Sequence, residues 1–71
     1  MNTAHTISED KAGKLRALIA GLQVGEVYAE PYNWQALPDV RLLVKEAEAM
    51  FPEREFHAGP TLNGFLIKRK K

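Results

Sequence analysis

The stretch that decides the fold is PDVRLLVKEAEAMF, residues 38–51. Its apolar residues recur at helical spacing, so at about 100° per residue they fall on a single stripe. The predicted stripe consists of Val40, Leu43, Val44, Ala47, Met50 and Phe51. Pro38 is tolerated in the first turn of a helix, whereas Pro52 cannot continue one. The pattern therefore predicts a helix over residues 38–51, with the stripe as the ridge of the core.

The opposite side of this predicted helix carries an apolar side chain where water is expected. Leu42 points almost directly away from the core stripe. The charged side chains that flank it are Arg41, Lys45 and Glu46. Two interpretations stay open. Either Leu42 is covered by another element or is one of the single exposed leucines of ordinary proteins, or it anchors a contact with a partner.

Length and composition bound what the chain can be. With 71 residues there is room for one domain, which at this size buries only about 60% of its unfolded surface. A partner or self-association would therefore add to its stability. No cysteine is present, which excludes disulfides and thiolate metal sites and fits a reducing cytoplasm. No apolar run approaches the roughly 20 residues of a membrane-spanning helix.

The beginning of the chain predicts a lead-in and a helix. Residues 1–7 have few apolar groups to hold them, so we expect a flexible segment. Ser8 is a good N-cap, and Gly21 suits a left-handed cap at the end of the helix. The predicted apolar stripe of this helix is Ala12, Leu15, Leu18, Ile19 and Leu22. Gly25 then marks a turn.

A short strand should follow. In residues 26–30 the side chains alternate, with Val27 and Ala29 on one face and Tyr28 among acids on the other. Pro31 closes this segment. The strand is therefore predicted to end directly before an aromatic segment.

That segment, YNWQAL, residues 32–37, is interpreted as a tight connection, with a single helical turn capped by Asn33 as the alternative. Trp34 within it has two interpretations. With Tyr32 it forms an aromatic pair of the kind that stacks on bases or anchors interfaces. Alternatively, Trp34 is a lid on the core, which is the commoner place for a tryptophan in so small a domain.

The end of the chain predicts a hairpin, with strands over residues 54–58 and 65–69. Asn63-Gly64 favours a type I′ turn with both residues at positive φ, although Gly59-Pro60 would allow a longer loop. We expect the apolar faces of the two strands to meet the helices on the same side of the sheet. Those faces consist of Phe56 and Ala58, and of Phe65 and Ile67.

The sequence offers little for catalysis or cofactor binding. Ser8 is used as a cap, and the histidines are His5 in the lead-in and His57 on a strand, so no nucleophile and base can be paired. Glu55 and His57 share a strand face but supply two metal ligands at best. The glycines form neither a GxGxxG motif nor a P-loop. We therefore expect a non-enzymatic protein without a cofactor, metal or small-molecule substrate.

The element order is helix, strand, helix, strand, strand. It predicts a single α+β domain over residues 8–69, with a three-stranded, mostly antiparallel sheet packed on two helices. This order resembles a reduced winged-helix domain, with LRALIAGL as first helix, VYAE as small strand and EFHAGPTLNGFLIKR as wing. Only NWQAL is left for the helix that precedes a recognition helix. The candidate recognition helix also exposes Glu46 and Glu48, which phosphates repel.

A second resemblance concerns GLQVGEVYAEP, followed by an amphipathic helix and a basic hairpin. This arrangement resembles small accessory proteins encoded by bacteriophages. The resemblance implies a regulator in the host cytoplasm that acts by binding, through DNA or through a host protein of the transcription or defence machinery.

Two functional hypotheses follow. Residues 54–71 carry five basic groups and one acidic group, and residues 70–71 form a basic tail that we expect to be solvated and frayed. A regulator would contact nucleic acid, or a machine that handles it, through this end. Its predicted phosphate contacts are Arg54, His57, Lys68, Arg69, Lys70 and Lys71. Alternatively, the protein inhibits a host enzyme without touching nucleic acid, through Leu42, Trp34, Arg41, Lys45 and Glu46.

Overall fold

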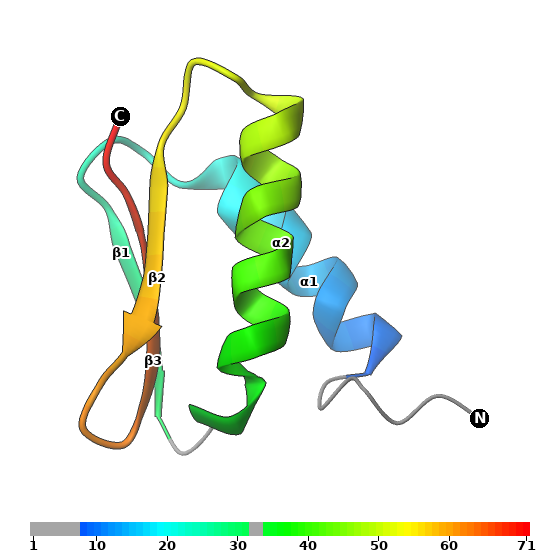
Figure 1. Cartoon of the computed structure of the whole chain (residues 1–71), viewed down its shortest axis with the longest axis vertical. Coiled ribbons are helices and arrows are strands. Elements are labelled where there is room, and N and C mark those ends of the chain that lie inside the picture. The colour runs from blue at the N-terminus through cyan, green and yellow to red at the C-terminus, as the bar shows by residue number, and fades with distance from the viewer. Residues whose placement is uncertain (1–7, 32–33) are drawn as a thin grey trace.

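The computed structural model describes residues 8–31 and 34–71. Its elements are α1 (Glu9–Gly21), β1 (Val27–Pro31), the 3₁₀ turn η1 (Trp34–Ala36), α2 (Leu37–Met50), β2 (Phe56–Pro60) and β3 (Gly64–Arg69). The strands form one antiparallel sheet in the order β1-β3-β2, and both helices lie on the same side of it (Figure 1). The predicted α+β class and element order are confirmed.

Some predictions cannot be compared with the structure. Those on residues 1–7, on Tyr32 and Asn33, and on the side chain of Trp34 lie outside the described residues. The described residues between β1 and α2 form the 3₁₀ turn η1, which runs directly into α2, so the alternative of a single helical turn fits this segment. Within the described residues, no helix is both long and apolar enough to cross a lipid bilayer.

The core fills the space between the sheet and the two helices. Its largest fully buried side chains, each 0% exposed, are Ile19 of α1, Val40 of α2, and Phe65 and Ile67 of β3. Around them pack Leu15, Leu22, Ala36, Leu37, Leu43, Val44, Ala47 and Phe56. The hairpin therefore meets the helices with one face, as predicted.

The central helix α2 follows the sequence closely except at its C-terminal end, where Phe51 of the predicted stripe is only partly buried and lies outside the core. Pro38 lies in its first turn, and the N–H of Phe51 closes its end on Ala47 O at 2.8 Å. The prediction that Met50 belongs to the buried stripe is wrong, because Met50 is 66% exposed. Opposite Met50 on α1 stands Ala20, which is too small to cover it.

The start of α1 agrees with the prediction from the sequence, whereas its C-terminal cap does not. Ser8 Oγ accepts the N–H of Lys11 at 3.1 Å, which confirms the N-cap. The left-handed cap predicted at Gly21 is wrong, since Leu22 caps the helix in an extended conformation. Leu22 is buried, so its side chain draws the chain into the core at this point. The left-handed glycine is Gly25, with φ of 85° in the following turn.

The hairpin turn lies one residue earlier than predicted. The N–H of Thr61 donates to Gly64 O at 2.9 Å, so the two-residue loop is Leu62-Asn63. Gly64 does not have positive φ; it belongs to β3 and pairs with Pro31. A Cβ on Gly64 would collide with the Glu30 carbonyl oxygen and lie 2.8 Å from Pro31 Cα. Close approach of β1 to β3 is therefore what requires glycine there.

Candidate functional site

Helices α1 and α2 leave two adjoining hollows between them. The first measures about 320 Å³ and the second about 100 Å³, and they share Arg16, Leu43 and Glu46. The first is otherwise lined by Ser8, Glu9, Ala12, Asp39 and Leu42. The second is otherwise lined by Ala20, Ala47, Met50 and Phe51. Together they form what we name the α1–α2 groove.

The groove exists because most of the side chains that line it on the α1 side are small. On α1 the wall repeats every four residues, which places its members along one side of the helix; they are Ser8, Ala12, Arg16 and Ala20. On α2 the facing residues follow the same interval and are Leu42, Glu46 and Met50. Small side chains on α1 thus leave larger ones on α2 uncovered, with Leu42 58% and Met50 66% exposed.

An ion pair joins the two walls where the hollows meet. Arg16 Nε lies 2.9 Å from Glu46 Oε2, and both side chains remain about half exposed. Pairs this exposed contribute little to stability. Its effect is to place charge where the first hollow, of mixed polarity, meets the mostly apolar second hollow. At the N-terminal end of both helices, the carboxylates of Glu9 and Asp39 also line the first hollow.

The residues predicted for a protein partner are only partly brought together. Leu42 and Glu46 line the groove, whereas Arg41 and Lys45 line neither hollow. Arg41 lies on the other flank of α2, where its Nε donates to Ala58 O at 3.4 Å. Sequence reasoning missed Ala12, Arg16, Ala20 and Met50. The signal available for Ala12 and Ala20 was the four-residue interval of small side chains on α1.

Two of the residues predicted to contact phosphate donate hydrogen bonds to the end of α1. Arg54 Nη1 donates to Ala20 O, and Arg69 Nη1 donates to Leu22 O, each at 3.0 Å. The guanidinium of Arg54 also lies 4.2 Å from the ring centre of Phe51. Carbonyl groups at a helix C-terminus lack partners within the helix. These arginines supply them from other parts of the chain.

The other predicted phosphate contacts lie at the hairpin. His57 and Lys68 are paired across β2 and β3, and both are exposed. Their shared face is the side of the sheet without helices (Figure 1). The backbone N–H groups of Lys70 and Lys71 both reach Glu55 O, at 2.7 and 3.3 Å. The predicted frayed tail is thus attached to the start of β2.

No family model, curated protein or solved structure matches the chain. Its function is therefore inferred from its own residues and their geometry.

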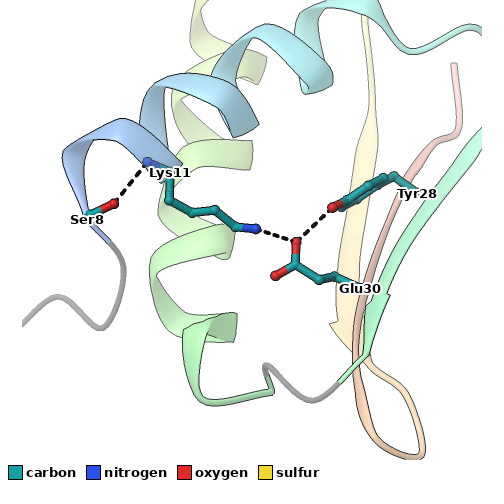
Figure 2. A network of polar contacts seen from close by, with 4 residues as sticks. All are labelled: Ser8, Lys11, Tyr28 and Glu30. Carbon is teal, nitrogen blue, oxygen red and sulfur yellow. Dashed lines mark hydrogen bonds and ion pairs between the residues drawn. The ribbon is translucent and has the colours of Figure 1, made fainter.

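A polar network ties α1 to β1 (Figure 2). Lys11 Nζ and the hydroxyl of Tyr28 both lie 2.7 Å from Glu30 Oε1, and Ser8 caps the helix turn that carries Lys11. The hydrogen bond to Glu30 raises the pKa of Tyr28, and burial and the charge of Glu30 act in the same direction. The hydroxyl is therefore held in its neutral form. None of these residues except Ser8 lines the groove.

The described residues offer no obvious metal centre. Over residues 8–31 and 34–71, no three His, Cys, Asp or Glu side chains are placed to hold an ion together. The arrangement that remains is a surface groove in which an ion pair separates a hollow of mixed polarity from a mostly apolar one.

Proposed function

We propose that the protein is a non-enzymatic binding protein that takes up an amphipathic helix of a partner protein in the α1–α2 groove. The observation that carries this proposal is Leu42, an apolar side chain 58% exposed at the edge of a hollow of about 320 Å³. Large apolar side chains beside a concave surface are typical of interface anchors.

The spacing of the groove favours a helix as its occupant. Leu42 and Met50 are eight residues apart on α2, which corresponds to about 12 Å along the helix axis. A partner helix with apolar side chains seven positions apart presents them about 10.5 Å from one another. One such side chain can enter each hollow, as in other helix-in-groove complexes. The residue between them then faces the pair of Arg16 and Glu46.

Charge favours a protein over a nucleic acid at this surface. Glu9, Asp39 and Glu46 line the first hollow together with Arg16, which is paired with Glu46, so the lining carries a net negative charge. Carboxylates oppose phosphate groups, whereas they attract basic side chains. A partner helix with lysine or arginine beside its apolar residues therefore complements the groove.

A second candidate function is weak binding of nucleic acid by the hairpin. It is favoured by the exposed pair of His57 and Lys68 on the open face of the sheet. Arg54 and Arg69 donate hydrogen bonds to carbonyl groups at the end of α1. Fewer cations therefore remain to bind phosphate. Binding of this kind would depend steeply on salt and little on sequence.

Affinity capture from a lysate of the cells that carry the gene separates the two functions. The baits are the wild-type chain, Leu42→Asp and the matched control Leu62→Asp, each with and without nuclease. Leu62 is 99% exposed in the hairpin loop and lines neither hollow. Both substitutions therefore introduce the same charge at an exposed leucine.

We expect one protein to be captured by the wild type and by Leu62→Asp, to be lost with Leu42→Asp, and to persist after nuclease treatment. Truncating an interface anchor commonly costs about 2 kcal/mol or more of binding free energy, which explains the loss. Capture that survives Leu42→Asp, or that vanishes on nuclease treatment, would contradict the proposal.

A further inference from the structure

The two outer strands of the sheet have unequal free edges. Since β3 lies in the middle, β1 and β2 each pair on one side only. In an antiparallel sheet, alternate residues direct their N–H and C=O groups to the neighbouring strand and the others direct them away. The bond from Arg69 N–H to Glu26 O (3.1 Å) fixes this alternation for β1. The bond from Thr61 N–H to Gly64 O fixes it for β2.

On β2 the residues whose backbone groups point away from β3 are Phe56, Ala58 and Pro60. Side chains of α2 form hydrogen bonds with this edge. The N–H of Phe56 donates to Glu48 Oε2 at 3.0 Å, and Ala58 O accepts from Arg41 Nε at 3.4 Å. Pro60 has no N–H to offer. Side chains and prolines at such positions are the usual protection of an edge strand. The edge of β2 therefore offers little to another strand.

On β1 the outward residues are Val27, Ala29 and Pro31. Within the described part of the chain, no side chain bonds to the outward backbone groups of Val27 or Ala29. Val27 is 50% exposed, and Ala29 and Pro31 are exposed as well. Pro31, like Pro60, has no N–H to offer, but the outward N–H and C=O groups of Val27 and Ala29 remain available beside apolar side chains in the described part of the chain.

Charged side chains often protect an edge, but those of this strand region are engaged within the chain. Glu26 Oε1 accepts the N–H of Gln23 at 2.8 Å. Glu30 is bound by Lys11 and by the hydroxyl of Tyr28. The charge of Glu30 is thus paired with Lys11, and the carboxylate of Glu26 is held toward the turn at Gln23.

We propose that β1 pairs antiparallel with β1 of a second copy of this chain, about a two-fold axis at Ala29. Each Ala29 then exchanges backbone hydrogen bonds with its counterpart, and each Val27 N–H reaches the carbonyl of Pro31 in the other copy. The small side chain of Ala29 allows the strands to meet at the axis. The two sheets join into one.

The chemistry of the facing residues fits a second copy. In this register Val27 of each copy lies opposite Pro31 of the other, so exposed apolar side chains cover each other on both sides of the axis. The interface consists of strand edges and falls short of the about 800 Å² per partner typical of stable complexes. Association is therefore concentration-dependent. It is independent of the proposed function, because no residue of β1 lines the α1–α2 groove.

Sedimentation equilibrium of the full chain over a wide concentration range tests the pairing. The wild type should rise from 8.0 kDa toward twice that mass. Ala29→Lys and Ala29→Glu should each remain monomeric, since like charges then meet at the axis. An equal mixture of the two variants should regain the dimer. Ala49→Lys, at an exposed alanine of α2, is the matched control and should behave as the wild type.

A wild type that keeps the mass of a single chain at every concentration overturns the proposal. So does an Ala29→Lys variant that associates as the wild type does. A mixture of the two charged variants that stays monomeric overturns the two-fold register. Circular dichroism of each variant shows that its fold is retained.

Discussion

The two flanks of α2 differ in how they are closed. On the flank toward β2, Arg41 and Glu48 bond directly to the backbone of the edge strand. On the flank toward α1, Leu42 and Met50 stand exposed beside hollows. The difference lies in what faces the helix. Long polar side chains meet unpaired backbone groups on one flank, whereas small side chains of α1 leave space on the other.

The largest expected effect separates two neighbouring leucines. Leu43 is 6% exposed and lies below the groove, whereas Leu42 is at its rim. Leu43→Ala should lower the free energy of unfolding by about 2–5 kcal/mol, because it leaves a cavity in the core. Leu42→Ala should change it by less than about 0.5 kcal/mol. Urea denaturation measures both, and equal losses would show that the two flanks are not distinct.

A smaller difference should separate two glutamates of α2. Glu48→Ala removes the acceptor of the Phe56 N–H, and loss of such a bond costs about 1–2 kcal/mol. Glu46→Ala removes only an exposed ion pair with Arg16 and should cost less than about 0.5 kcal/mol. Thermal unfolding of both variants checks the order. A larger stability loss for Glu46→Ala than for Glu48→Ala would mean that Glu48 does not fix the flank of α2 that faces β2.

Filling the open flank should affect binding more than stability. Ala12 lines the first hollow and is half-buried, so Ala12→Leu places apolar atoms in that space. We expect the free energy of unfolding to stay the same or to rise by up to about 1 kcal/mol, from the apolar area buried. Capture of the partner should be lost. Ala49→Leu, at an exposed alanine outside the groove, is the control.

The smallest expected effect concerns the polar network of Lys11, Tyr28 and Glu30, which joins α1 to β1. The raised pKa of Tyr28 means that the folded state holds its proton more tightly than the unfolded state, whose pKa is near 10.0. The stability that this contributes is complete below about pH 10 and is lost as the pH rises through the folded pKa. Tyr28→Phe should lack this part of the alkaline loss. Urea titrations of both chains at increasing pH measure it, and identical slopes would contradict the assignment.

Much of the fold follows from local patterns in the sequence. The stripe of Val40, Leu43, Val44 and Ala47 predicted α2, and Ser8 predicted the start of α1, because both depend on near neighbours in the chain. The turn at Asn63-Gly64 was wrong for a non-local reason. Gly64 is needed where β1 comes close to β3, which no short window of sequence reveals.

The candidate site was less predictable than the fold. The exposure of Leu42 follows from helix geometry, and the structure confirms it. The groove beside it depends on which face of α1 meets α2, a tertiary property. The roles of Arg54 and Arg69 escaped prediction for the same reason, since their acceptors at Ala20 and Leu22 are distant in sequence.

The most direct test of the groove uses nuclear magnetic resonance of the isotope-labelled chain. The probe is a synthetic helical peptide with two leucines seven positions apart and lysines beside them, titrated against a peptide of the same composition with adjacent leucines. We expect the first peptide alone to shift the backbone amide signals of Ala12, Leu42 and Met50, and Leu42→Asp to abolish these shifts. Shifts centred on His57 and Lys68, or equal shifts with both peptides, would contradict a helix-binding groove between α1 and α2.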